Sequence, residues 1–341
     1  MRRIRAVVYG VGAMGCRTAG LLEAHDVEIV AAIAQSDEKV GKDLGDVAGL
    51  GRQVGVTVER DADAVLKEAN ADVALVAVNS YLADNRPHLE ACARAGVNVI
   101  TLAEEAFYPW ITSPELTGDL DRLAKEHGVT ITGGGTQDVF WHHLVTTLMG
   151  ASSRVESVSG HTQADVNDFG PEVARYMRIG AAPAEVVESL EQAEERPPTF
   201  GAVGLHALIA ATGLTIAGSS SETRPDVGAV PMRCWCLDTI VDAGRVVGLT
   251  EVDRIETVEG VDFSFELSVH IFQPDETDLT EWTVAGDPLL RPTNPEMPTE
   301  AVTCTQLVNR IPDVINAAPG FVTVDRLPAP RYRPLPLATY L

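Results

Sequence analysis

The chain has little positive charge. Its 341 residues include 26 lysines and arginines against 49 aspartates and glutamates, a formal net charge of -23 at pH 7. Nucleic acids and anionic membranes are bound through clustered basic side chains, and an acidic surface repels their phosphates. We therefore expect neither nucleic acid nor a membrane as a partner.

Long apolar runs and a regular cysteine framework are also missing. No apolar stretch approaches the roughly 20 residues of a membrane-spanning helix, and the first three residues lead directly into an apolar segment without the cleavage site of a signal peptide. The five cysteines are odd in number and scattered: Cys16, Cys92, Cys234, Cys236 and Cys304. We expect reduced thiols in the cytoplasm. No second ligand pair accompanies Cys234 and Cys236, so no metal site is predicted.

What the chain does contain, from Ile4 to about Gly135, is an alternation of short β-branched runs with helical stretches. This order is typical of βαβ units in a parallel sheet. The predicted strands are Ile4–Tyr9, Val27–Ala34, Val54–Val58, Val73–Val78, Val97–Leu102 and Val129–Thr132, and the helices between them include Asp61–Ala69 and Arg86–Ala95. The pattern predicts a doubly wound Rossmann domain.

The pattern changes after Gly135. A helix is predicted at about Asp138–Met149, and the strands after it alternate polar with apolar residues. The clearest strand places Phe263, Phe265, Leu267, Val269 and Ile271 on one face and Ser264, Glu266, Ser268 and His270 on the other. Such alternation is typical of a half-exposed strand in a largely antiparallel sheet.

These patterns predict an α/β chain of two domains. The Rossmann domain is expected over residues 1–135, with 303–341 packing back on it through a helix at Thr303–Ile315. Residues 136–302 are expected to form a substrate and oligomerisation domain of the α+β type. An open, mainly antiparallel sheet often pairs with a second copy, so we expect a homodimer.

A glycine-rich turn, Gly10-Val11-Gly12-Ala13-Met14-Gly15, follows the first predicted strand and opens a helix. In this context the pattern predicts a dinucleotide site. Gly10 permits the tight turn, Gly12 lets the backbone approach the pyrophosphate, and Gly15 allows close helix–strand packing. The helix N-terminus then faces the negative charge of the pyrophosphate. We expect a nicotinamide dinucleotide as cofactor.

The second predicted strand is followed by Gln35 and Ser36 rather than by the carboxylate that binds the ribose 2′-hydroxyl in NAD-preferring enzymes. Gln35 and Ser36 can donate hydrogen bonds to a 2′-phosphate, and Arg17 or Lys39 can supply charge. We predict NADP(H) as the preferred cofactor with NAD(H) tolerated. Asp37 keeps NAD(H) open, and the two basic residues fit ordinary surface charges equally well.

Polar residues follow two further predicted strands, at the sheet edge where open α/β folds bind ligands. Asn79 and Ser80 are predicted to border the nicotinamide ribose, and Glu104 and Glu105 follow the next strand. A buried carboxylate is costly unless it is paired or functional. Neighbours in an extended segment point to opposite faces, so we expect one of the two glutamates in the active cleft. The alternative is that both cap the next segment or lie in solvent.

Several motifs occur in an order that resembles a known family. They are the Gly10–Gly15 turn, Lys39–Gly45, Glu104-Glu105 with Tyr108-Pro109-Trp110, Gly133–Gln137, and Val308–Pro312 with Ala318-Pro319-Gly320. As an ordered set they resemble the 2,4-diaminopentanoate dehydrogenases and the related native amine dehydrogenases. The resemblance implies reversible NAD(P)-dependent reductive amination of small ketones or aldehydes with ammonia. It also implies Glu104 as the central catalytic residue, with Glu105 as the alternative, assisting carbinolamine and iminium formation before hydride transfer.

The second domain is expected to complete the substrate pocket. The predicted pocket residues are Gln137, Phe140, Trp141, Asn167 and Phe169. Their aromatic rings favour a modest carbonyl compound, and no arginine cluster suited to an amino-acid carboxylate is evident. Phe140 and Trp141 fit ordinary helix packing equally well. Asn309 is predicted either beside the nicotinamide carboxamide or as a tie on the returning helix.

Two other functions remain open on these residues. One is a different reductase, of the dihydrodipicolinate reductase or homoserine dehydrogenase type, and the other is a catalytically inactive protein that senses NADPH. Glu104 in its apolar setting favours an enzyme over a sensor. The predicted cofactor contacts are Gly10, Gly12, Ala13, Met14, Gly15, Arg17, Gln35, Ser36, Asn79, Ser80 and Asn309.

Overall fold

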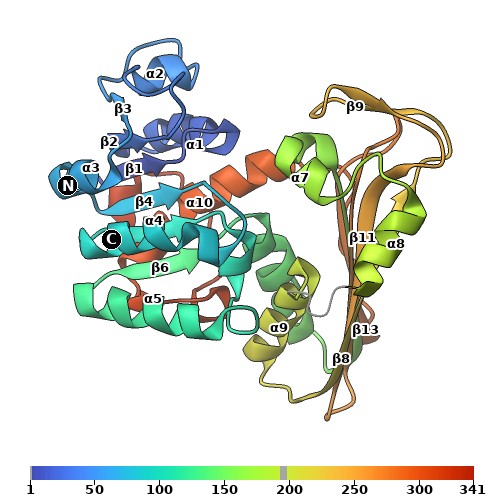
Figure 1. Ribbon diagram of the computed structural model, residues 1–341. Helices are drawn as coiled ribbons and strands as arrows, with labels where there is room; N and C mark the ends of the chain where they lie inside the picture. The colour runs from blue at the N-terminus through green and yellow to red at the C-terminus, as the bar shows by residue number, and fades with distance from the viewer. Residues whose placement is uncertain (1, 193–197) are drawn as a thin grey trace. The chain divides into compact units, whose positions relative to one another are not determined.

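The computed structural model describes residues 2–192 and 198–341 (Figure 1). The chain divides into two compact units. Unit 1 comprises residues 1–143 and 299–341, and unit 2 comprises residues 144–298. The chain therefore leaves unit 1 after His143 and re-enters it at Thr299.

Unit 1 is built on a seven-stranded sheet. Its strands are β1 (Arg5–Tyr9), β2 (Glu28–Ile33), β3 (Val58–Glu59), β4 (Val73–Val76), β5 (Asn98–Thr101), β6 (Thr130–Gly133) and β15 (Gly320–Phe321). They lie in the order β15-β6-β5-β4-β1-β2-β3, and every neighbouring pair is parallel. The predicted Rossmann sheet is confirmed. The direction of winding reverses between β1 and β4, which is where such sheets bind ligands.

Helices cover both faces of this sheet. They are α1 (Ala13–Ala24), α2 (Leu44–Val47), α3 (Ala62–Ala69), α4 (Leu82–Arg94), α5 (Pro114–His127) and α10 (Thr299–Ile315). One apolar cluster joins the sheet to α3, α4 and α5, and a second joins the other face to α1 and α10. Alternate residues of each strand enter opposite clusters, as Val7 and Val8 of β1 do, because successive side chains of a strand point to opposite faces.

Local signals place several of these helix ends. The Asp61 side chain accepts the backbone N–H of Ala64 at 3.1 Å and caps the start of α3. Helix α5 begins at Pro114, where the missing N–H costs nothing, and ends at Gly128 in the left-handed conformation. Three short 3-10 segments, η1 (Glu104–Phe107), η4 (Val324–Arg326) and η5 (Leu337–Tyr340), complete unit 1 together with the π-helical turn η2 (Asp138–His143).

Two predicted elements differ from the observed ones in more than their end residues. The expected strand Val54–Val58 is reduced to β3, because the Asp43 carboxylate accepts the backbone N–H groups of Val54 and Gly55 and holds this stretch as a loop. The helix expected over Asp138–Met149 is divided into η2 and α6 (Leu144–Gly150). The division coincides with the boundary between the two units.

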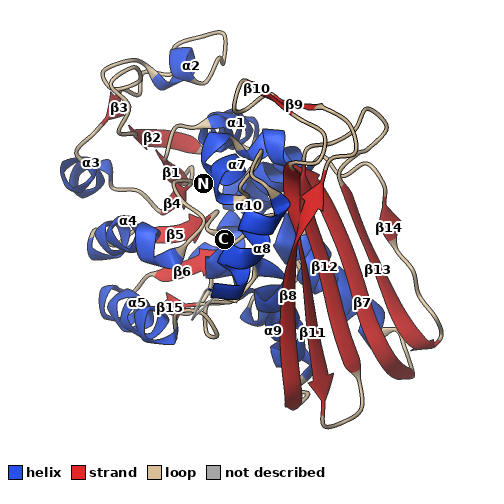
Figure 2. Cartoon of the chain, turned by 45° about the vertical axis from the view of Figure 1, so that its right-hand side comes forward, coloured by secondary structure: helices blue, strands red, loops and turns tan. Residues whose placement is uncertain are grey.

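Unit 2 contains a six-stranded mixed sheet (Figure 2). Its strands are β7 (Arg154–Asp165), β8 (Ile216–Val227), β11 (Val246–Thr257), β12 (Asp262–His270), β13 (Leu279–Asp287) and β14 (Thr293–Asn294), in the order β14-β13-β7-β12-β11-β8. Only β7 and β12 are parallel among these neighbours. The expected alternation in β12 is confirmed at Phe263 and Phe265, which are buried, and at Ser264 and Glu266, which are partly exposed. It is wrong at Ser268, which is buried and hydrogen-bonded to the Thr250 hydroxyl at 2.9 Å.

The remaining elements of unit 2 are helices and a hairpin. They are η3 (Val166–Phe169), α7 (Pro171–Tyr176), α8 (Pro183–Gln192), α9 (Phe200–Thr212), β9 (Met232–Cys234) and β10 (Thr239–Val241). Helix α9 packs on β11 and β12, and α8 packs on β8. Within the described ranges, no helix combines the length and apolar character needed to cross a membrane.

Candidate active site

Two glycines of the turn after β1 are required by contacts inside unit 1. Gly10 has φ +98°, in the left-handed region, and a Cβ there would lie 2.7 Å from the carbonyl carbon of Ala77 and closer still to its oxygen. A Cβ on Gly15 would lie 3.0 Å from the carbonyl carbon of Gly10 and closer still to its oxygen. Only glycine fits both positions, so the turn is as tight as the sequence predicts.

Gly12 differs from its two neighbours in the motif. It caps α1 in an extended conformation, and a Cβ there would meet no described atom within 4 Å. Among the described residues, no side chain caps this helix, and its first turn holds no acidic residue. Gly12 and Ala13 are exposed and Met14 is partly exposed, so the first turn presents its N–H groups without a side-chain cap at the positive end of the helix dipole. This cradle fits a pyrophosphate.

Basic side chains follow β2 and β3. The Lys39 ammonium donates to the carbonyl of Val11, inside the turn, at 2.7 Å. Arg60 directly follows β3 and pairs with Asp37, which follows β2. Arg60 is not among the cofactor contacts predicted from the sequence. Its position shortly after the predicted third strand was the signal that could have identified it. A phosphate bound near the end of β2 would meet two cations rather than an unpaired carboxylate.

The other predicted contacts near this end have local partners. The Gln35 amide donates to the backbone carbonyl of Arg60 at 3.4 Å, and the Ser36 hydroxyl accepts the backbone N–H two residues later. Arg17 lies 3.6 Å from the carboxylate of Glu300, on α10. Roles of these three side chains toward a cofactor stay predictions.

The two adjacent glutamates after β5 have different environments. Glu105 is buried, with 5% of its surface exposed, and both carboxylate oxygens are engaged. One accepts the backbone N–H of Leu82 at 2.6 Å, and the other accepts the Ser113 hydroxyl at 2.6 Å. Leu82 is the first residue of α4, so Glu105 caps that helix from a distant part of the chain. Each of its carboxylate oxygens therefore has a hydrogen-bond partner within unit 1.

The carboxyl group of Glu104 has a shifted pKa. Burial raises its pKa above the usual value, and a hydrogen bond with the Ser80 side chain partly opposes that rise. The Ser80 carbonyl in turn accepts the backbone N–H of Glu105 at 3.2 Å, which joins the segments after β4 and β5. Asn79 contributes its carbonyl to the amide of Asn85 at 2.8 Å. The predicted strand-end residues therefore meet at one edge of the sheet.

The end of β6 reaches the same edge. A Cβ on Gly133 would lie 2.6 Å from the backbone nitrogen of Phe107, so this strand end is pressed against the turn η1 that carries Glu104. Gly134 donates its N–H to the carbonyl of Thr101, at the end of β5, at 3.0 Å. Gln137 follows, and its side-chain oxygen would lie 2.6 Å from a Cβ added to Gly135.

The aromatic pair in η2 is unequally exposed: Trp141 is buried, with 6% of its surface exposed, whereas Phe140 is partly exposed. In unit 2, Asn167 accepts the backbone N–H of Trp235 at 2.7 Å and that of Cys236 at 3.3 Å, which ties the β9–β10 hairpin to η3. Phe169 is 41% exposed. Substrate contacts by these four side chains stay predictions.

Asn309 lies on α10, on the side opposite Leu307, which packs in the core. Its side-chain oxygen is buried and has no hydrogen-bond partner among residues 2–192 and 198–341. The predicted contact with the nicotinamide carboxamide stays a prediction.

Comparison with known proteins identifies the family. Residues 139–333 match the family described as the 2,4-diaminopentanoate dehydrogenase C-terminal domain, and residues 4–101 match the N-terminal domain of dihydrodipicolinate reductase. The chain is 28% identical over 347 residues to the 2,4-diaminopentanoate dehydrogenase of Acetoanaerobium sticklandii, covering 97% of this chain and 95% of that one.

Solved structures agree with this result. The amine dehydrogenase from Mycobacterium smegmatis is 52% identical, with a TM-score of 0.93 over 98% of each chain. The biliverdin reductase of Synechocystis is 14% identical, with a TM-score of 0.57 over 95% of this chain and 94% of that one, and shares the fold alone. The chain therefore belongs to the 2,4-diaminopentanoate dehydrogenase family and is an oxidoreductase.

Proposed function

We propose that this protein is an NAD(P)H-dependent amine dehydrogenase, which aminates small ketones or aldehydes with ammonia and deaminates amines in the reverse direction. The single observation that carries the proposal is the pair of glutamates after β5. Glu105 is fully engaged by Leu82 and Ser113, whereas Glu104 has a raised pKa and lies at the ligand-binding edge of the sheet. The relationship to the amine dehydrogenase of Mycobacterium smegmatis supports the same chemistry.

Different residues bind the cofactor and transfer protons in such a reaction. The Gly10–Gly15 turn and the N-terminus of α1 hold the pyrophosphate of the dinucleotide, which when bound supplies or accepts the hydride. Glu104 takes a proton from ammonium or from the attacking amine. It then returns a proton to the carbinolamine hydroxyl, which leaves as water. A carboxyl group whose pKa is raised above its usual value holds a proton more readily, which suits a group that accepts and then donates a proton within one turnover.

The matched variants Glu104→Gln and Glu105→Gln test this assignment. We expect Glu104→Gln to bind NADPH normally and to lose ammonia-dependent NADPH oxidation by about 10²-fold or more, as for the loss of a general acid–base group. Glu105→Gln should instead lower thermal stability, and the molecules that remain folded should turn over. Wild-type rates with cyclohexanone or a short aldehyde that did not depend on ammonia would favour the reductase alternative. Undiminished turnover in Glu104→Gln would refute the assignment.

We propose NADP(H) as the preferred cofactor, with NAD(H) tolerated. Lys39 and Arg60 support a 2′-phosphate beside the end of β2, and Asp37 is neutralised by Arg60. Arg60→Met should raise the KM for NADPH by about 10-fold, the value of one charge-assisted contact, and leave the KM for NADH unchanged. Arg52→Met, which removes an exposed arginine paired with Glu23, is the matched control. A wild-type preference for NADH would overturn the proposal.

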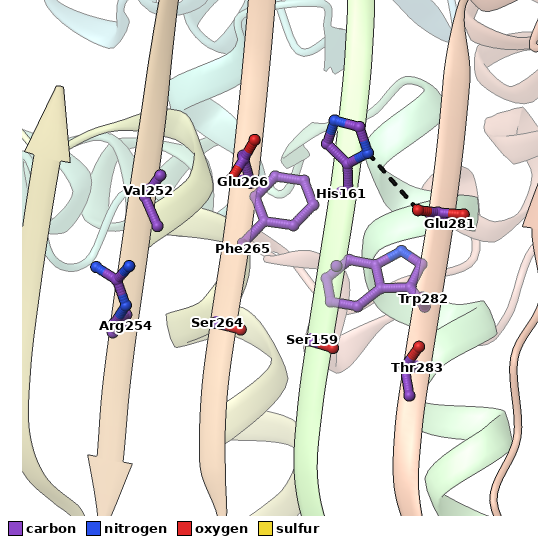
Figure 3. A pocket seen from close by; sticks show the side chains of 11 residues that line it. Ser159, His161, Val252, Arg254, Ser264, Phe265, Glu266, Glu281, Trp282 and Thr283 are labelled. Carbon is purple, nitrogen blue, oxygen red and sulfur yellow. Dashed lines mark ion pairs between the residues drawn. The ribbon is translucent and has the colours of Figure 1, made fainter. Parts of the chain in front are cut away.

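We also propose a homodimer formed through unit 2. Helices α8 and α9 pack against strands of its sheet. The side chains of Ser264 and Glu266, on strand β12 of that sheet, are polar and partly exposed. A groove of about 450 Å³ on this sheet is lined by charges of both signs, Arg254 with Glu266 and Glu281, and by His161, which lies 3.7 Å from Glu281 (Figure 3). A two-fold partner presents the same surface, so a mixture of signs suits self-association. Reversing Glu266 and Glu281 to arginine should give monomers in analytical ultracentrifugation, and a monomeric wild type would exclude the dimer.

The five free cysteines support a reducing, cytoplasmic environment.

A further inference from the structure

One stripe of α10 holds the segment that follows β6. Thr303, Gln306 and Arg310 are spaced by three and four residues, so they share a face of the helix. The Thr303 hydroxyl accepts the backbone N–H of Thr136 at 3.2 Å, and the Gln306 side-chain oxygen accepts the backbone N–H of Gly135 at 2.8 Å. Two successive backbone groups at the end of β6 are thereby fixed by side chains from the C-terminal part of the chain.

The third residue of the stripe forms a buried ion pair. Arg310 and Asp138 are both fully buried, and the guanidinium donates to both carboxylate oxygens, at 2.8 Å through Nε and at 2.6 Å through Nη2. Gln306 donates to the same carboxylate, and Arg310 also donates to the backbone carbonyl of Pro328. His143 Nε2 lies 3.1 Å from Asp138. Burying two charges costs desolvation free energy that their attraction offsets only in good geometry, so this pair keeps its partners in a fixed arrangement.

This clamp, made of Thr303, Gln306, Arg310 and Asp138, acts on the catalytic edge of unit 1. It holds residues 135–138, and Gly133, two residues earlier, is pressed against the turn η1 that carries Glu104. It also joins the two segments through which the chain leaves and re-enters unit 1, since η2 ends at His143 and α10 begins at Thr299. A shift of the clamp would move the β6 end and Glu104 together.

We propose that Arg310 is a positioning residue for the reaction, acting through Asp138 and Gln306 to place the β6 end against Glu104. The part of this inference that concerns turnover rests on the proposed function. The part that concerns the backbone after β6 is independent of it. Displacement of a catalytic group by about 1 Å from a distant substitution can cost about 10²-fold in rate, which sets the size of effect expected here.

The variant Arg310→Met tests the inference, with Arg333→Met as the matched control. Arg333 is also a nearly buried arginine, and it shares Asp313 with Arg310, since Asp313 lies 2.6 Å from Arg333 and 3.4 Å from Arg310. Its guanidinium stacks on Tyr340, so Arg333→Met perturbs the same ion network and leaves the contacts of Arg310 with Asp138 in place. In hydrogen exchange, the peptide over residues 133–138 should exchange at least 10-fold faster in Arg310→Met than in wild type, and at the wild-type rate in Arg333→Met. Equal exchange in both variants would overturn the proposal, whatever reaction the protein catalyses.

Kinetics then separate positioning from folding. Arg310→Met leaves the buried carboxylate of Asp138 without its arginine partner, which destabilises the fold. The double variant Arg310→Met/Asp138→Asn removes that charge and is included to restore folding. We expect the double variant to recover the melting temperature while kcat stays about 10²-fold low, the pH profile of kcat shifts, and the Kd for NADPH is unchanged. Recovery of kcat together with the melting temperature would show that the pair acts on stability alone. Absence of ammonia-dependent turnover in the wild type would refute the proposed function and leave the exchange result standing.

Discussion

Alanine substitutions along the glycine turn should separate folding from cofactor binding. At Gly12, φ is −86° and ψ is −164°, an extended conformation that alanine adopts freely, and the added methyl would meet no described atom within 4 Å. Gly12→Ala therefore leaves the apoprotein intact. The methyl would nevertheless occupy the space where the pyrophosphate approaches the backbone, so cofactor affinity should fall.

The magnitudes follow from three contributions. Replacing glycine by alanine stabilises by roughly 0.4–1 kcal/mol through the unfolded chain, and loss of a favourable N-cap residue costs about 0.5–1 kcal/mol. These offset each other for Gly12→Ala, and the melting temperature should stay within about 3 °C of wild type. At Gly15 the new methyl would lie 3.0 Å from the carbonyl carbon of Gly10 and closer to its oxygen. Since that neighbour is backbone, overpacking should cost roughly 1–3 kcal/mol or more.

Differential scanning fluorimetry with and without NADPH, together with fluorescence titration of NADPH, checks these values. We expect Gly12→Ala to melt like the wild type without cofactor, to lose most of the shift that NADPH produces, and to bind NADPH at least 10-fold more weakly. Gly15→Ala should be destabilised even without cofactor. If Gly12→Ala bound NADPH with wild-type affinity, the pyrophosphate would not lie against Gly12, and the interpretation of the turn would be refuted.

Two further predictions concern unit 2. Burial raises the pKa of Glu251 from 4.5 to about 7, with nearby Asp253 adding to the rise, so the folded chain keeps a proton that the unfolded chain loses between these pH values. Stability therefore falls as pH rises through this window, and Glu251→Gln should gain up to about 3 kcal/mol over wild type at pH 8 and little at pH 4 in urea unfolding. Parallel pH curves for the two proteins would contradict this. At Gly160, an added Cβ would lie 2.6 Å from the stacked rings of Phe265 and Trp282. Gly160→Ala should lose roughly 1–3 kcal/mol and alter the near-ultraviolet circular dichroism of the tryptophan, and an unchanged spectrum and stability would show that the stack has room to move.

Short-range patterns were enough for much of the fold. Alternation of β-branched runs with helical stretches predicted the parallel sheet, and the spacing of Gly10, Gly12 and Gly15 predicted a turn whose closeness the structure confirms. The alternation in β12 predicted its buried and partly exposed faces at every position but Ser268, which is buried. These features depend on side-chain period and backbone conformation, which are set within a few residues.

Contacts between distant segments decided the rest. Helix α4 begins at Leu82, earlier than predicted, because its first N–H is capped by Glu105, 23 residues later in the chain. The same contact distinguishes Glu105 from Glu104. Because the two residues are adjacent, the sequence alone offered no way to tell their environments apart. The strand expected at Val54–Val58 was lost to the carboxylate of Asp43 for a similar reason.

The sequence by itself determined that the chain has a dinucleotide turn and two carboxylates at the end of the fifth strand. Only the tertiary structure decided which of the two carboxylates caps α4 and which residues hold the backbone around the other. Asp138 and Arg310 stand 172 residues apart, and no local pattern links them. Partners at such separations are chosen when helices and strands pack, because the cost of burying each charged or polar group is met only by whichever group the fold brings beside it.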